Sequence, residues 1–182
     1  KKIDFIFPLA GLVGAPLCKS KPQEAKEVNE DSIKLLCKVA DKDTKIIIPT
    51  TNSGYGIGSK NSFCSETSPI NPISVYGKSK LAGENELKSS SVLSIIIRTS
   101  WLYSDYGENF LKKIIKIGKT KKEVKLIDDQ IGSPTNAADL AKLIIHILKF
   151  DNYQWSIADI FHFSNEGSCS WFEFANEIVK LY

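Results

Sequence analysis

Three short apolar runs, separated by segments with helical periodicity, constrain the fold of this chain more than any other feature. The runs occupy residues 3–7, 45–49 and 93–97, and each contains two or three Ile residues. Short runs of this kind are typical of strands that are buried on both faces of a parallel sheet. Their alternation with helical segments predicts an α/β fold with a doubly wound parallel sheet.

The segments around these runs predict the remaining elements. Residues 22–40 carry apolar side chains at helical spacing and begin with Pro22, a residue suited to the first turn of a helix. Residues 52–71 are rich in Gly, Ser, Asn and Pro, which predicts a functional surface loop. We also expect helices at residues 74–89, 109–117, 137–148 and 171–181 and short strands at residues 124–127 and 160–163.

Composition and charge exclude several classes of protein. The 182 residues are 42% hydrophobic and 25% charged, as in ordinary globular domains, and no apolar run is long enough to span a membrane. The net charge of +3, with Arg98 as the one Arg, argues against a nucleic-acid surface. The four cysteines share no metal-ligand or disulfide spacing, so we expect no metal site and reduced thiols in a cytoplasmic protein: Cys18, Cys37, Cys64 and Cys169.

The segment Tyr76-Gly77-Lys78-Ser79-Lys80 carries the strongest chemical signal in the chain. Four-residue spacing places Tyr76 and Lys80 on one face of a helix. The pKa of a free Tyr is about 10, and a neighbouring ammonium lowers it by favouring the phenolate. The pair therefore predicts a general acid, although a Tyr and a Lys at this spacing also occur as an ordinary surface pair.

A hydroxyl cluster upstream strengthens the catalytic interpretation. Thr50 and Thr51 directly follow the predicted strand at residues 45–49, and ligands of open α/β sheets bind beyond the carboxyl ends of strands. A Thr hydroxyl at this position can hydrogen-bond a substrate oxygen, or it can satisfy its own turn. We base the prediction of a site on the two features together.

With these residues the chain resembles the extended short-chain dehydrogenase/reductase superfamily, whose members use a Ser/Thr, Tyr and Lys triad on a Rossmann sheet. The resemblance implies that Thr51, Tyr76 and Lys80 are catalytic and that the cofactor is NAD(P)H. It further implies that Tyr76 and Lys80 contact the cofactor together with five other residues: Leu9, Ala10, Gly11, Asn29 and Thr99.

Four motifs in the second half of the chain resemble the dTDP-4-dehydrorhamnose reductases within that superfamily. The motifs lie in order at residues 97–103, 107–110, 128–135 and 166–175. The resemblance implies reduction of the 4-keto group of a dTDP-4-keto-6-deoxy sugar in dTDP-L-rhamnose synthesis. Tyr76 would donate the proton and Trp101 would offer a flat face to the sugar ring. The residues implied to bind the nucleotide sugar are Thr51, Asn52, Trp101, Asn109, Gln130 and Pro134.

Some features leave alternatives open. The segment Thr50–Gly56 is closer to nucleotide-sugar epimerases and dehydratases, so an enzyme of that type remains the second interpretation. Arg98 fits either an ion pair or a role in the site, where it would meet a phosphate or help to shape the pocket. His146 and His162 are expected to be ordinary side chains of a helix and a strand, since neither has a partner at metal-ligand spacing.

The chain contains no G-x-x-G-x-x-G or G-x-G-x-x-G loop, which in this superfamily follows the first strand and holds the cofactor pyrophosphate. We therefore expect a sheet that lacks its first strands, about 60 residues by βαβ length, and a small C-terminal substrate-binding part. Residues 1–103 would form a partial NAD(P)-binding Rossmann domain and residues 104–182 a partial nucleotide-sugar-binding region. A non-catalytic truncated binding module also stays open, as does a homodimer.

Overall fold

The computed structural model describes residues 2–58, 63–121, 123–150 and 152–182. The chain divides into two compact units, which are described separately below. Unit 1 comprises residues 1–98 and 154–162, and unit 2 comprises residues 99–153 and 163–182. Among the described residues, none of the helices has the length and apolar character that crossing a membrane requires.

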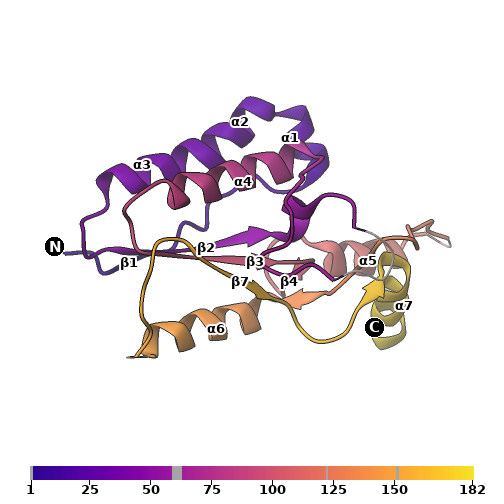
Figure 1. Ribbon diagram of the computed structural model, residues 1–182. Coiled ribbons are helices and arrows are strands. Elements are labelled where there is room, and N and C mark those ends of the chain that lie inside the picture. Colours follow the sequence, from indigo (N-terminus) through magenta and orange to yellow (C-terminus); the bar gives the residue numbers. More distant parts are fainter. Residues whose placement is uncertain (1, 59–62, 122, 151) are drawn as a thin grey trace. The chain divides into compact units, whose positions relative to one another are not determined.

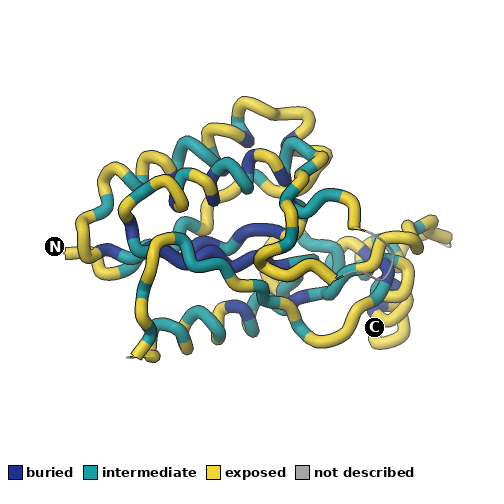
Figure 2. The backbone as a smooth tube through the Cα atoms, in the orientation of Figure 1, coloured by how far each residue is buried: buried dark blue, intermediate teal, exposed yellow. Residues whose placement is uncertain are grey.

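A four-stranded sheet with the order β1-β2-β3-β7 forms the centre of unit 1. Strand β1 pairs with β2 in parallel, with Ile6 opposite Ile46. Every residue of β3 is buried, and β2 is buried over most of its length (Figure 2). This confirms the buried strands predicted at residues 45–49 and 93–97, whereas the strand predicted at residues 3–7 is limited to Phe5–Ile6, which is half-buried, and Ile3 is exposed. The strands are β1 (Phe5–Ile6), β2 (Lys45–Thr51), β3 (Ser94–Thr99) and β7 (Asp159–Phe163).

The helices of unit 1 lie together over one face of this sheet (Figure 1). They are α1 (Ala15–Ser20), α2 (Pro22–Lys26), α3 (Ser32–Val39) and α4 (Val75–Lys88). Their apolar sides meet the sheet in one core, built from Ile33, Ile46, Ile48, Leu87, Val92 and Ile96.

The segment predicted as one helix at residues 22–40 is helical throughout but not uniform. A π-helical turn, Glu27–Asp31, separates α2 from α3. Such turns insert an extra residue into the helix and are frequent at functional sites. The short helix α1 was not predicted; it has a Pro in its first turn.

Two glycines let α4 pack against its neighbours at very short distances. A Cβ atom on Gly83 would lie 2.3 Å from the backbone oxygen of Asn29 in the π-helical turn. A Cβ atom on Gly77 would lie 2.6 Å from the backbone oxygen of Ser53, just after β2. Ser74 caps α4 by accepting a hydrogen bond from the Gly77 amide. These contacts fix the first turns of α4 against the end of β2.

The described residues of unit 2 form three helices and two small strand pairs. Strand β4 (Leu102–Tyr103) pairs in parallel with β6 (Thr135–Asn136), and β5 (Ile131–Gly132) pairs in antiparallel fashion with β8 (Cys169–Ser170). Helices α5 and α7 share a core of Ile114, Ala175 and Ile178. The helices are α5 (Phe110–Gly118), α6 (Ala137–Lys149) and α7 (Trp171–Leu181).

The strand predicted at residues 124–127 is wrong, because described residues 123–127 form no strand. Leu126 packs against the core between α5 and α7, whereas Val124 and Ile127 are exposed. Only Leu126 of this segment is thus packed, and it covers helices rather than forming part of a sheet.

Candidate active site

Strand β2 and helix α4 bring the three predicted catalytic residues together. Thr51 is the last residue of β2, and Tyr76 and Lys80 lie in the first two turns of α4. The Tyr76 phenol interacts with the side chain of Thr51, which acts to lower the Tyr76 pKa. The Lys80 ammonium donates to the backbone oxygen of Pro49 at 3.3 Å. The cluster therefore lies at the carboxyl end of β2, the edge where α/β sheets bind ligands.

The Thr51 hydroxyl is held by its own turn. It accepts a hydrogen bond from the Ser53 amide at 3.1 Å and donates to the Ser53 hydroxyl at 3.0 Å. Thr51 is also 8% exposed. The hydroxyl is thus fixed in position before any ligand arrives.

The electrostatics of the pair differ from the prediction that Lys80 lowers the pKa of Tyr76. Burial raises the pKa of Tyr76 above 10.0, and the interaction with Thr51 offsets only part of that increase. Burial also lowers the pKa of Lys80, against the opposing effect of the Glu84 carboxylate. Tyr76 consequently keeps its proton at neutral pH, as a proton donor must.

Asn29 organises the predicted cofactor loop. Its side chain lies in the π-helical turn and is 4% exposed. The amide group donates to the Leu12 backbone oxygen and to the Ser79 hydroxyl, both at 2.9 Å, and its oxygen accepts from the Leu12 amide at 3.0 Å. Asn29 thereby ties the loop after β1, which contains the exposed residues Leu9, Ala10 and Gly11, to helix α4.

A buried ion pair beside the cluster resolves the open interpretation of Arg98. The Arg98 Nη2 atom lies 2.6 Å from Oε2 of Glu84, and the two side chains are only 2% and 3% exposed. The Thr50 hydroxyl donates to Glu84 Oε1 at 2.6 Å. Arg98 also donates to the Tyr55 hydroxyl, which is hydrogen-bonded to His162 Nε2 at 2.6 Å. The ion-pair alternative is therefore correct for this structure.

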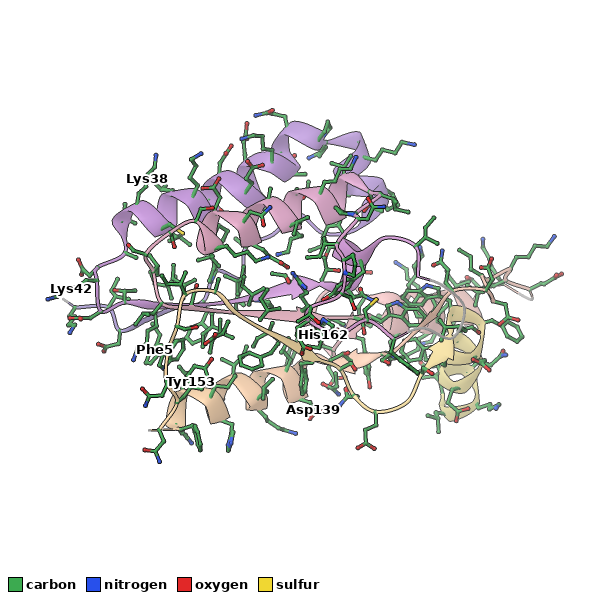
Figure 3. All side chains as sticks on the ribbon, in the orientation of Figure 1. Phe5, Lys38, Lys42, Asp139, Tyr153 and His162 are labelled. Atoms are coloured by element: carbon green, nitrogen blue, oxygen red, sulfur yellow. The ribbon has the colours of Figure 1, made fainter. Side chains whose placement is uncertain are left out.

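Sequence reasoning missed Glu84, Tyr55 and His162 as members of this network. His162, labelled in Figure 3, is in β7, 107 positions from Tyr55. One local signal was available, since Glu84 follows Lys80 by four residues and so shares its helix face. Because Glu84 binds the hydroxyl of Thr50, the network fixes the residue next to Thr51.

In unit 2, Trp101 is packed differently from the prediction. Its indole stacks on that of Trp171, with 3.5 Å between ring centroids and 12° between planes. One face of Trp101 is thus covered by protein, whereas the sequence suggested a face open to a sugar. The Trp171 ring nitrogen donates to the side-chain oxygen of Gln130 at 3.3 Å, which brings the predicted residue Gln130 into the same group.

The other predicted ligand residues occupy varied surroundings. Asn109 caps α5, accepting from the Lys112 amide, and Asn52 is an exposed residue of the short turn after β2. Pro134 is half-buried. The Thr99 hydroxyl is buried without a hydrogen-bond partner among the described residues, which is unusual for a native polar group and points to a ligand.

No group of three or more His, Cys, Asp or Glu side chains in the described part of the chain is arranged to hold a metal ion. The predicted catalytic cluster itself presents a phenol, an ammonium and a hydroxyl group at the end of a parallel strand. This combination of fold and site defines the extended short-chain dehydrogenase/reductase class, as the sequence resemblance predicted.

Comparison with known proteins gives the family. The sequence model of the RmlD substrate binding domain family matches residues 2–182, and the chain belongs to that family. A dTDP-4-dehydrorhamnose reductase of Sinorhizobium fredii is 34% identical over 181 residues, which are 98% of this chain and 61% of that protein. The chain thus spans less than two thirds of the length of this relative.

Solved structures agree on the fold. The crystal structure of a dTDP-4-dehydrorhamnose reductase from Bacillus anthracis, in complex with NADP, is 33% identical and has a TM-score of 0.88. The match covers 98% of this chain and 62% of that one. A UDP-glucuronic acid 4-epimerase from Bacillus cereus, solved with NAD, has a TM-score of 0.83 over 98% of this chain and 58% of its own. At 22% identity that likeness concerns the fold alone. The predicted Rossmann-like parallel sheet is confirmed.

Proposed function

We propose that this chain is the catalytic part of an NAD(P)H-dependent oxidoreductase that reduces the 4-keto group of a dTDP-4-keto-6-deoxy sugar, as in dTDP-L-rhamnose synthesis. The observation that carries the proposal is the cluster of Thr51, Tyr76 and Lys80 at the carboxyl end of β2, with Tyr76 held in its protonated form. The names of the Sinorhizobium fredii and Bacillus anthracis relatives support the choice of substrate.

The residues present fit the nicotinamide half of the cofactor. The Lys80 ammonium has three N–H donors, of which the structure engages one, at the Pro49 oxygen. The remaining donors suit the ribose hydroxyls. The unpartnered Thr99 hydroxyl and the loop at residues 9–11, which Asn29 anchors, are the other groups that we assign to the cofactor. When bound, NAD(P)H supplies a hydride to the carbonyl carbon.

Tyr76 and Thr51 are assigned to the carbonyl oxygen of the substrate. Tyr76 donates its phenolic proton to this oxygen as the C=O bond becomes a C–O bond, and the product is an alcohol. Thr51, fixed by its turn, hydrogen-bonds the same oxygen. Lys80 is assigned to the nicotinamide ribose, with its ammonium held at the Pro49 oxygen. Trp101, Asn109, Gln130, Pro134 and Asn52 are assigned to the nucleotide sugar.

The two regions of the chain are assigned different roles in the reaction. We assign cofactor binding and catalysis to residues 1–103 and most of the nucleotide-sugar binding to residues 104–182, with Asn52 and Trp101 contributing from the first region. The four cysteines are free, which fits a reducing compartment such as the cytoplasm. A homodimer remains a prediction that size-exclusion chromatography tests.

Oxidation of NADPH by the full-length gene product with dTDP-4-dehydrorhamnose tests the reductase proposal. We expect turnover by the wild type, and a loss of about 10²- to 10⁴-fold in kcat for Tyr76→Phe because the proton donor is removed. Tyr106→Phe, at a residue that is 86% exposed, is the control. Turnover that survives Tyr76→Phe contradicts the assigned role. Interconversion of nucleotide sugars without net NADPH oxidation would instead favour the epimerase that residues 50–56 leave open.

A further inference from the structure

Trp101 has a backbone conformation that a bulky residue seldom adopts. Its φ is +46°, in the left-handed region that favours glycine. Residues persist in such conformations only where the surrounding structure holds them, and they cluster at ligand sites. The backbone conformation of Trp101 must therefore be held by its neighbours, and it marks Trp101 as a candidate ligand-binding residue.

Two neighbours in unit 2 hold the indole of Trp101. Trp171 stacks on it with ring centroids 3.5 Å apart. Gly132 lies against it so closely that a Cβ atom there would be 2.4 Å from the indole Cε2 and 2.7 and 2.8 Å from the ring atoms Cζ2 and Nε1. These three similar distances place Gly132 over the ring rather than beside its edge. The indole is thus clamped, and the residue that clamps it is itself anchored.

The anchoring of Trp171 comes from three elements. Trp171 is the first residue of α7, where Ser170 and Glu173 form a capping box. Its ring nitrogen donates to Gln130, and its ring lies 4.4 Å from that of Phe110 in α5. An aromatic side chain fixed in this way can set the plane of its stacking partner.

We propose that Trp171 is a positioning residue: it holds the half-buried Trp101 so that the part of the indole left open by Trp171 and Gly132 recognises the deoxy-sugar ring of the nucleotide sugar. The proposal rests on the proposed function for its ligand class. It differs from the sequence-based expectation, because the indole of Trp101 is not a free platform and its recognition geometry depends on a second tryptophan 70 positions later in the chain.

The test compares binding of two probes, dTDP-L-rhamnose and dTDP, to the full-length gene product by calorimetry. Trp171→Ala is expected to weaken dTDP-L-rhamnose about tenfold and to leave dTDP unchanged, because the lost stacking affects only the sugar contact. Trp171→Phe retains a ring that can stack and is expected to keep the affinity within about threefold. Phe172→Ala, at the next residue of α7, is 45% exposed and is the matched control.

Circular dichroism supplies a readout that does not depend on the ligand. Two indoles stacked at 3.5 Å couple their transitions, so the wild type should show an exciton couplet. The couplet should vanish in Trp171→Ala and Trp171→Phe and persist in Phe172→Ala. A couplet that survives Trp171→Ala shows that the stack does not exist in solution and overturns the proposal.

A folded Trp171→Ala variant that binds dTDP-L-rhamnose as the wild type does overturns the proposal, and so does an equal loss for dTDP. If Trp171→Ala does not fold, Gly132→Ala displaces Trp101 from the other side, and an unchanged affinity in that variant is equally decisive. A wild type that binds neither probe overturns it as well. A selective loss in a protein that does not oxidise NADPH with dTDP-4-dehydrorhamnose would leave the positioning role standing while the proposed reaction fails.

Discussion

Glu84→Gln tests how much the buried ion pair beside the cluster stabilises unit 1. Glu84 and Arg98 lie 2.6 Å apart with side chains 3% and 2% exposed, and the pair links α4 to β3. The variant keeps the shape of the side chain but leaves the Arg98 charge buried without a counter-charge. Lys21–Glu24 gives a matched comparison, since its atoms are 2.7 Å apart but its side chains are 53% and 45% exposed.

The two ion pairs differ in burial rather than in distance, so we expect their removal to lower the free energy of unfolding by different amounts. Removing one partner of a buried pair costs about 3–5 kcal/mol, because the remaining ion has lost both its water and its partner. An exposed pair contributes about 0–1 kcal/mol. We expect Glu84→Gln to lose about 3 kcal/mol, near the lower limit because the Gln oxygen still accepts hydrogen bonds. Glu24→Gln should lose less than about 1 kcal/mol.

Urea denaturation followed by far-ultraviolet circular dichroism measures both free energies of unfolding. The midpoint of the Glu84→Gln variant should fall while the slope with urea stays the same. Salt at about 1 M should erase the small effect of Glu24→Gln and leave that of Glu84→Gln, since buried charges are screened much less. A loss below about 1 kcal/mol for Glu84→Gln, or equal losses for both variants, refutes the reasoning from burial.

Two further predictions concern helix α4 and the Tyr76 proton. Gly83→Ala should destabilise the protein by about 1–3 kcal/mol, because its Cβ would meet the backbone of Asn29 at 2.3 Å. Gly118→Ala in α5, where a Cβ would have no atom within 4 Å, is the control and should be neutral or stabilising. Equal shifts of the two variants in thermal unfolding would contradict the role of the Gly83 contact. The raised pKa of Tyr76 means that the folded chain binds more protons than the unfolded chain above pH 10.0, so stability should fall as pH rises there. Tyr76→Phe should reduce that fall in urea titrations from pH 9 to 11, whereas exposed Tyr106→Phe should not; identical pH dependence in both would refute the assignment.

Local patterns sufficed for the core and for part of the site. The Ile residues of β2 and β3 form buried strands because consecutive β-branched residues favour extended chain and need two covered faces. Tyr76 and Lys80 share a helix face because the helical repeat places them there. The segment at residues 124–127 shows the limit, since its apolar pattern predicted a strand but only Leu126 packs, against helices α5 and α7.

What the amino-acid sequence determined by itself is therefore the longer helices, the buried strands β2 and β3 and the spacing of Thr51, Tyr76 and Lys80. The tertiary structure decided which distant side chains meet: His162 with Tyr55, Arg98 with Glu84, and Trp171 with Trp101. It also decided that Tyr76 holds its proton more tightly, rather than less, than a free tyrosine. The physical reason is the separation along the chain over which each effect acts. Periodicity acts between neighbours in the chain, whereas burial and pairing depend on how whole elements pack.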